Sequence, residues 1–426
     1  MAGALVAIQL DCFVAPQSGA SRNDKPPGGA RLGLSSRGNR GSILIIVMWI
    51  CFGLVALTLY FANSMNSEMQ AAENRTSEVA ARQALEGGER YAATLLTQYG
   101  INGKVPDIDE YRSEAMPVGG AKFWFIGRHN DITPAQPAPD EPYFALVDEA
   151  SKLNLNTVTS TMIQALGIPD MTPEFADAIV AWRTANSQAA LAAENYYSQL
   201  EPPRHNKGAP YESVDELRLV QGSMLNLIFG EDTNRNGLLD ANENDGDASA
   251  PRDDQDGQLL PGLLEYFTVY SSEPATGASG SRRISVTGLT TQQARQALQT
   301  RLTQVGIAQQ RATQILARFP FNAQNPQQTP APTSVADFMV TSQMTAEEWE
   351  LVHTELTAAT ATTGIATGLV NVNTAGYAVL SAIPGIGPDN ASSIVAYRAS
   401  NPDVLTNFAW LTQVMSPANI RTAGRY

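Results

Sequence analysis

The chain of 426 residues contains few cysteines and few histidines. The two cysteines, Cys12 and Cys51, both lie near the N-terminus, so the rest of the chain cannot be held together by disulfides. The histidines show no spacing typical of a metal or catalytic site; they are His129, His205 and His353. Nucleophile motifs and glycine-rich phosphate loops are also missing, and we therefore predict that the protein is not an enzyme.

Basic residues are scarce relative to acidic ones, and they are unevenly distributed. The first 41 residues carry five basic and two acidic side chains, which gives a net charge of +3. Because the whole chain carries −14, residues 42–426 carry −17. A body this acidic repels nucleic acid and anionic lipid but attracts cations. We therefore predict no nucleic-acid partner.

A long apolar run follows the basic segment. Residues 42–62 contain no charged side chain and, as a helix, would span about 31 Å, the thickness of a bilayer's hydrocarbon core. Arg37 and Arg40 precede the run, which predicts a cytoplasmic N-terminus and a single pass through the membrane. A cleaved secretory signal is the competing interpretation, but the helical pattern continues without proline to residue 99. The membrane helix is therefore predicted to extend as an amphipathic stem.

Two β-rich stretches follow the stem. We predict strands at residues 123–126 and 143–147, separated by the proline-rich stretch 133–142, and a further strand at 266–270. Farther along, residues 289–318 are predicted to be helical and 344–356 to be a short helix, whereas 322–334 and 357–368 are predicted linkers.

An internal repeat indicates two related helical modules. The segment Leu-Asn-Leu-Asn-Thr at 153–157 is echoed by Val-Asn-Val-Asn-Thr at 370–374, and Ile-Val-Ala-Trp-Arg at 179–183 by Ile-Val-Ala-Tyr-Arg at 394–398. In each copy a threonine, Thr157 or Thr374, is the predicted N-cap of the first helix.

The second copy contains Ile-Pro-Gly-Ile-Gly-Pro at 383–388, which resembles a helix-hairpin-helix motif. Glycines allow such a hairpin to turn tightly, and the amides of the following helix can bind a phosphate. The first copy, at 165–169, lacks the second glycine. Basic residues are sparse around both hairpins, so protein packing is the favoured role, while DNA binding stays open as an alternative.

Residues 231–256 form an acidic segment with nine acidic and two basic side chains. Twelve of its residues, 232–243, fit the pattern of an EF-hand calcium loop. The predicted ligands are the side chains of Asp232, Asn234, Asn236, Asp240 and Glu243 and the backbone carbonyl of Leu238. Gly237 stands where this loop turns sharply. The sequence thus predicts a structural Ca²⁺ site.

A second group of acidic residues is a further candidate for Ca²⁺. Its members, whose spacing fits no single loop, are Asp245, Asp247, Asp253, Asp254 and Asp256. Whether a second ion binds is left open, because an acidic run is also typical of a solvated loop.

The basic tail, the Arg-Gly junction, the apolar helix and the stem together resemble a type IV pilin or pseudopilin. The resemblance implies cleavage by a prepilin peptidase between Gly41 and Ser42, with Gly38 as a weaker candidate. Most members carry glutamate at the fifth mature position, where this chain has Ile46. A carboxylate there needs a neighbouring subunit's ammonium group, so Ile46 favours the first, or tip, position of a fibre over a tolerated substitution.

Taken with the repeat and the acidic loop, residues 34–426 resemble type II secretion system protein K, the largest minor pseudopilin. The resemblance implies an α+β fold: a pilin-like long N-terminal helix with a small antiparallel sheet, plus a large inserted, mostly helical domain with two helix-hairpin-helix (SAM-like) modules. It also implies calcium binding, a tip complex with other minor pseudopilins, initiation of pseudopilus assembly, and a location in the bacterial inner membrane with the bulk in the periplasm.

Two alternatives are a competence-type DNA receptor anchored in the membrane and a type IV pilus tip protein. The resemblance further implies closing strands after the second module, whereas the sequence ends at Arg425-Tyr426, and the leader is long for the family. The completeness of the C-terminus and the true start methionine therefore stay open.

The chain is thus expected to consist of nine parts. They are a leader (1–41), a membrane helix (42–62), a stem (63–100), pilin-like strands (101–150), a first module (151–230), the acidic loop (231–262), strands (263–288), a helical segment with linkers (289–368) and a second module (369–426).

Overall fold

The structure is a computed structural model, and it describes residues 41–99, 106, 108–128, 141–249, 252–322, 324, 330–359 and 365–426, with side chains from residue 44 onward. The predicted leader and large parts of both predicted linkers lie outside the described residues. The chain divides into two compact units. One contains the described residues 41–90 and 115–124, and the other contains the remaining described residues from 91 onward.

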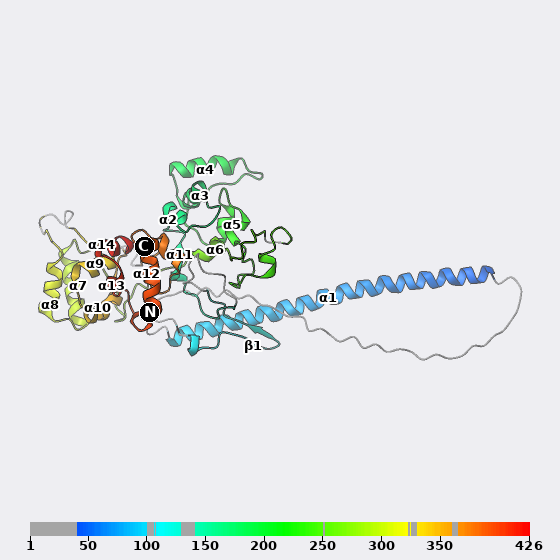
Figure 1. Cartoon of the computed structure of the whole chain (residues 1–426), viewed down its shortest axis with the longest axis horizontal. Coiled ribbons are helices and arrows are strands. Elements are labelled where there is room, and N and C mark those ends of the chain that lie inside the picture. The colour runs from blue at the N-terminus through cyan, green and yellow to red at the C-terminus, as the bar shows by residue number, and fades with distance from the viewer. Residues whose placement is uncertain are drawn as a thin grey trace. The chain divides into compact units, whose positions relative to one another are not determined.

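The first unit is built on α1 (Gly41–Tyr99), the long helix of Figure 1. Every described side chain from Leu44 to Val79 is exposed. This is the one helix in the described part of the chain that is long and apolar enough to cross a membrane.

A short antiparallel hairpin belongs to the same unit. It consists of β1 (Met116–Val118) and β2 (Ala121–Phe123), joined at a Gly-Gly turn in which Gly119 has a φ of +60°. Val118 packs closely against Gly87 of α1, where a Cβ atom would lie 3.0 Å from the valine side chain. This hairpin is the small antiparallel sheet that the fold class requires.

The predicted strands differ from the observed ones. The pairing lies at 116–123, a few residues before the predicted strand 123–126, because the Gly-Gly turn sets the hairpin. Residues 143–147 form no strand, although the Gly127 amide donates to the Tyr143 carbonyl at 2.7 Å. The prediction of a strand at 143–147 was therefore wrong.

The second unit begins with the end of α1 and leads into the first helical module. The elements up to the acidic loop are η2 (Ile108–Glu110), η3 (Glu149–Ser151), β3 (Leu153–Asn154), α2 (Ser160–Ala165), α3 (Pro173–Arg183), α4 (Gln188–Ser198), η4 (Val214–Leu219) and α5 (Leu225–Phe229). The helix starts follow local chemistry: Thr172 caps α3 through the Phe175 amide, and proline occupies the first turn. Thr159, and not the predicted Thr157, caps α2.

The middle of the chain contains the acidic loop and a second group of helices. The elements are η5 (Ala241–Glu243), α6 (Leu263–Tyr266), β4 (Phe267–Thr268), β5 (Ile284–Ser285), α7 (Gln292–Gln304), α8 (Gln309–Ala317), α9 (Val335–Ser342), α10 (Ala346–Val352), η7 (His353–Glu355) and β6 (Leu356–Thr357). Gly306, with a φ of +106°, breaks the predicted helical stretch 289–318 into α7 and α8. The predicted strand 266–270 is reduced to β4, because α6 occupies Tyr266.

Two-residue parallel pairings join distant parts of the second unit. Strand β3 pairs with β4, and β5 pairs with β6. The sequence did not predict these pairings, because each involves only two residues on either side and leaves no alternating pattern.

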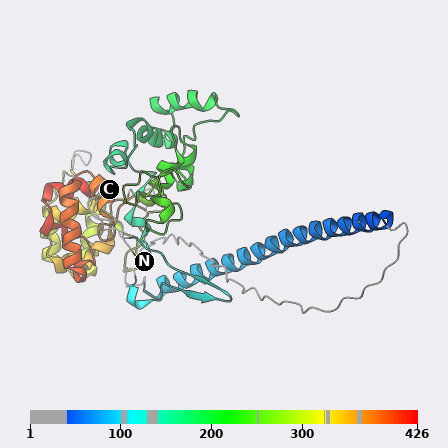
Figure 2. The ribbon, with the colours of Figure 1, turned by 45° about the vertical axis from the view of Figure 1, so that its right-hand side comes forward.

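The second module completes the chain. It comprises α11 (Tyr377–Ala382), α12 (Gly387–Ser400), η8 (Pro402–Val404), α13 (Leu411–Val414) and α14 (Pro417–Ala423). The N-cap of α11 is Gly376, and no side chain caps this end of the helix. The prediction that Thr374 is the N-cap was therefore wrong. Figure 2 shows α7–α10, in yellow, beside the orange and red helices of this module, and Trp349 of α10 packs edge-on against Phe408 at 5.4 Å.

One apolar core runs through the second unit from β3 to α14. Its fully buried members come from both modules and from the helices between them, and they include Leu153, Ile163, Leu263, Phe267, Phe338, Trp349 and Leu380. Burial of this much apolar surface is the main stabilising term that such a unit has in the absence of disulfides.

Candidate functional site

The predicted calcium loop is an excursion between α5 and α6, and its two ends meet. Gly230 and Pro261 form an isolated antiparallel bridge. A Cβ atom on Gly230 would lie 2.2 Å from the Leu260 carbonyl, and one on Gly262 would lie 2.1 Å from the Ile228 carbonyl. Only glycine permits this approach of two backbones. The base of the loop is therefore closed by the protein backbone itself.

The first half of the loop has the turn that its sequence predicts. The Gly237 amide donates to Oδ2 of Asp232 at 2.9 Å, and Gly237 has a φ of +73°. Oδ1 of Asn234 accepts from the Asn236 amide at 2.9 Å, and Oδ1 of Asn236 accepts from the Leu238 amide at 2.8 Å. These successive turns bring the side chains of positions one, three and five of the twelve-residue pattern into one short loop.

The acidic residues at the end of the pattern are held by donors from within the loop. Oδ2 of Asp240 accepts from the amide groups of Asn234 and Asn236 at 2.6 and 2.9 Å. Glu243 accepts from the backbone amides of Thr233 and Asp240 at 3.1 and 3.2 Å. No three histidine, cysteine or acidic side chains converge as a metal cluster within the described residues. A cation in this loop would therefore depend on amide and carbonyl oxygens as well as carboxylates.

Asp232 has an unsatisfied oxygen. Its residue is 6% exposed, and Oδ1 has no hydrogen-bond partner although it is buried. Burial raises the pKa of Asp232 above its ordinary value, opposed by the Arg128 charge and the Gly237 amide. Burial likewise raises the pKa of Glu243, and repulsion from Asp232 and Asp240 adds to this. A buried carboxylate oxygen without a partner is unfavourable, so the unpartnered Oδ1 of Asp232 fits a cation.

The second acidic group folds differently. Asp253 accepts from the backbone amides of Asp245, Gly246 and Gln255, at 2.9 to 3.0 Å. Asp245 accepts from Ser249, whereas Asp247 forms an exposed ion pair with Arg252 at 2.8 Å. Asp254 and Asp256 each accept from the amide two residues later. All five carboxylates have partners within the protein, so this group has less need of a metal ion than Asp232 has.

The two helical modules share an arginine at the same position of the repeat, partly buried in the first and buried in the second. In the first, Arg183 donates to the carbonyls of Leu155 and Val158. In the second, Arg398 donates to the carbonyls of Val372 and Ala375 at 2.9 and 2.7 Å. In each module, the arginine that ends the second repeated segment thus binds the carbonyls of the turn with which the module begins.

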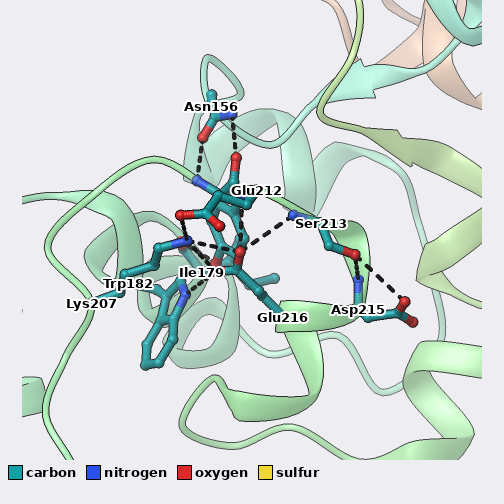
Figure 3. A network of polar contacts seen from close by, with 9 residues as sticks. Asn156, Ile179, Trp182, Lys207, Glu212, Ser213, Asp215 and Glu216 are labelled. Atoms are coloured by element: carbon teal, nitrogen blue, oxygen red, sulfur yellow. Dashed lines mark hydrogen bonds and ion pairs between the residues drawn. The ribbon is translucent and has the colours of Figure 1, made fainter.

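The first module also contains a polar network, which joins its opening turn and α3 to residues 207–216, the segment that follows α4 (Figure 3). Asn156 accepts from the Tyr211 amide at 2.7 Å and donates to the Tyr211 carbonyl at 3.0 Å. Glu216 accepts from Lys207 at 2.8 Å and from the Trp182 indole at 3.1 Å. Burial works to raise the pKa of Glu216, but these donors and two backbone amides outweigh it and lower the pKa below its ordinary value.

The hairpin of the second module faces the chain's own C-terminal helix. A Cβ atom on Gly385, whose φ is +92°, would lie 2.8 Å from the Asn419 carbonyl and 2.9 Å from the Ala423 amide of α14. In helix-hairpin-helix proteins that bind DNA this edge must approach a phosphate. Here protein atoms cover Gly385, and Asp389 adds a negative charge to the first turn of α12.

Comparison with known protein families agrees with this architecture. Residues 144–228 match the family model described as type II secretion system (T2SS), protein K. Residues 144–228 are thus similar to a protein K domain. Residues 366–414 match the helix-hairpin-helix motif. No curated protein and no solved structure matches the chain.

The protein K domain covers the first module and the approach to the acidic loop. It supports a minor pseudopilin in type II secretion, and together with the single apolar helix α1 it fits a single-pass inner-membrane protein. Pseudopilins of this system are structural and not catalytic. The predicted cleavage junction lies between the first two described residues, Gly41 and Ser42, and the leader residues before it lie outside the described residues.

Several residues that organise the site were not predicted. Asp148 accepts from Asn371 and Thr374 of the second module at 2.8 and 2.6 Å, joining it to the start of the first. Arg128 connects the acidic loop to other segments. Neither residue belongs to a motif, so no signal in a single sequence identifies it. The two arginines of the repeat were visible in the sequence, but their role was not.

Proposed function

We propose that the protein is a minor pseudopilin at the tip of the type II secretion pseudopilus, where it initiates assembly and supports protein export across the outer membrane. The match of residues 144–228 to protein K carries this proposal. The partners are other minor pseudopilins, and the prepilin peptidase cleaves between Gly41 and Ser42. The N-terminus is cytoplasmic, and the bulk lies in the periplasm.

The proposal is tested by deleting the gene in its host and measuring the exported proteins in the medium. Secretion should stop and return with the plasmid-borne full chain, and the purified protein should begin at Ser42 by mass spectrometry. Undiminished secretion in the deletion strain would contradict the proposal. A mature N-terminus at Asn39 would instead assign cleavage to Gly38.

The tip position is supported by Ile46, which is apolar and 56% exposed on α1. A glutamate there would lie in the membrane without a neighbouring ammonium group, which disfavours it by about 2.5 kcal/mol or less near a helix end. We expect Ile46→Glu to reduce secretion while Ile46→Leu leaves it unchanged. Full secretion by Ile46→Glu would argue against the tip.

We further propose that residues 232–243 hold a structural Ca²⁺ ion through the ligands predicted from the sequence. Support comes from the unpartnered, buried Oδ1 of Asp232. Calcium at one hundred times its dissociation constant stabilises the folded state by about 2.7 kcal/mol. Thermal unfolding of the full chain in detergent should therefore shift upward with CaCl₂ relative to EDTA.

The matched variants are Asp232→Ala and Asp177→Ala, the latter an exposed aspartate of α3. The calcium-dependent shift should disappear in the first and persist in the second. An equal calcium-dependent shift in both variants would place the ion elsewhere, most simply at the group around Asp253. Absence of any shift in the wild type would contradict calcium binding.

The alternative, a membrane-anchored DNA receptor, is favoured by the helix-hairpin-helix match alone. The packing of Gly385 against α14 and the net charge of −17 beyond residue 41 oppose it. A gel-shift titration of the full chain with duplex DNA at physiological salt separates the two functions. We expect no shift, and salt-dependent binding would favour the receptor.

A further inference from the structure

We propose that Arg128 couples the occupancy of the calcium loop to the segment Phe125–Arg128 and, through Phe125, to the end of the stem helix. Arg128 is thus a positioning residue. This inference rests on the proposed calcium site and adds the segments on which bound calcium acts. The contacts that carry it all lie within the second compact unit.

The Arg128 side chain donates hydrogen bonds to three residues. Its Nε donates to Glu265 of α6 at 2.8 Å, its Nη1 to the Gly127 carbonyl at 2.9 Å, and its Nη2 to the Arg235 carbonyl at 2.9 Å. The side chain is 9% exposed. A planar guanidinium with its donors fixed in this way joins three segments rigidly, which a lysine could not reproduce.

The contact with the loop leaves the proposed ligands accessible. Arg235 is the fourth residue of the twelve-residue pattern, and its carbonyl is not among the oxygens that such a loop offers to calcium. Arg128 also lies beside the sharp turn, since a Cβ atom on Gly237 would lie 3.9 Å from its Nη1. The arginine therefore holds the loop from outside without occupying the place of a ligand.

The charge of Arg128 is compatible with a nearby cation because Glu265 pairs with it. The pair is close to neutral as a unit, so its field on an ion at Asp232 is much weaker than that of a lone arginine. The dominant influence of Arg128 on the loop is then geometric, and a change in the loop is transmitted to the segment that precedes Arg128.

That segment is connected onward to the end of α1. The Gly127 amide donates to the Tyr143 carbonyl, and the Phe125 amide donates to the Ser113 carbonyl, both at 2.7 Å. The Phe125 ring stacks on Tyr91 of α1, with centroids 5.9 Å apart and planes at 8°. Ordering of the loop by an ion thereby restrains the base of the stem helix.

Hydrogen exchange of the full chain in detergent, with CaCl₂ or EDTA, measures this coupling. In the wild type we expect calcium to slow exchange at the Phe125 and Gly127 amides by about tenfold, a coupling of the size seen between contacting groups. In Arg128→Ala the slowing should fall below about twofold, while calorimetry with CaCl₂ still detects binding. Arg128→Lys, which keeps the charge, should show a similar loss, and it decides the matter if the alanine variant does not fold.

Arg318→Ala is the matched control, because it removes an exposed arginine at the C-cap of α8. Its calcium effect should equal that of the wild type. Full calcium-dependent protection in a folded Arg128 variant overturns the coupling but leaves the calcium site intact. Absence of calcium binding by the wild type overturns both, and the secretion test of the proposed function stands apart from either result.

Discussion

The first and second helical modules share a scaffold but differ in what covers them. Both begin with the repeated asparagine segment, and both use a terminal arginine, Arg183 or Arg398, to hold the opening turn. Around the first hairpin, a Cβ atom on Gly167 would meet nothing within 4 Å, whereas Gly385 of the second is packed against α14. The asparagine segment and the arginine, which the modules share, stabilise each module internally. The surroundings of the hairpin glycine, which differ, depend on the segments that pack against each module.

The surroundings of the two hairpins differ in the same way. Residues 165–170 line an open cleft of about 880 Å³ that also borders the acidic loop and α11. The hairpin of the second module is instead covered by α14 of the same module, and the end of α14 packs against α9, where a Cβ atom on Gly424 would lie 2.4 Å from the Ala336 side chain. One hairpin is thus left accessible, and the other is used for internal packing.

The strongest test of the shared scaffold is to remove its arginines. Arg398 is 6% exposed, and Arg398→Ala leaves the Val372 and Ala375 carbonyls without their charged donor, so we expect a loss of about 3 kcal/mol. Arg183→Ala should cost less, because Arg183 is only partly buried. Urea unfolding of the full chain measures both, and exposed Arg318→Ala should change little. A larger loss for Arg183→Ala would break the equivalence.

Alanine at the two hairpin glycines sharpens the difference between the modules. Gly385→Ala places a methyl group against α14 and is expected to destabilise by about 2 kcal/mol or more. Gly167→Ala meets open space and should cost about 1 kcal/mol, from its φ of +70° alone. Thermal unfolding measures the stability lost by each variant, and each variant serves as the control for the other. Equal losses of stability would mean that α14 does not cover Gly385 in solution.

A smaller effect, dependent on pH, should be confined to the first module. In the first module the Trp182 indole donates to the carboxylate of Glu216, whereas in the second module the Trp410 indole donates to the neutral Asn373 at 2.9 Å. Because the pKa of Glu216 is lowered on folding, the stability it contributes is present above its unfolded pKa of about 4.3 and is lost as the pH falls through the folded value.

Glu216→Gln should therefore flatten the fall in melting temperature between pH 5 and pH 3 relative to the wild type, to the extent that this carboxylate contributes. Other carboxylates with lowered pKa values, such as Glu348 and Glu355, titrate in both proteins, so the difference between the two curves is the measurement. Glu212→Gln, at an exposed neighbour of Lys207, is the control. Identical slopes for all three proteins would show that Glu216 gains nothing from its donors.

The sequence predicted the fold class, the helix from residue 42 into the stem and the family, because each depends on local composition or on a repeat. It misplaced the strands, since a three-residue hairpin set by Gly119 and two-residue parallel pairings leave no periodic signal. It predicted the sharp turn at Gly237 of the first acidic loop, but not that Asp232 would keep an unpartnered oxygen. Arg128 and Asp148 act on segments more than one hundred residues away, and such contacts follow only from tertiary packing.

The glycine crossing at the base of the acidic loop has a consequence for protein engineering. Because Gly230 and Gly262 bring the ends of the excursion together, the acidic loop leaves the chain and returns to it at one point. Replacing the residues between these glycines by a short turn is therefore expected to leave the directions of α5 and α6 unchanged, while removing the contact between Arg128 and the Arg235 carbonyl.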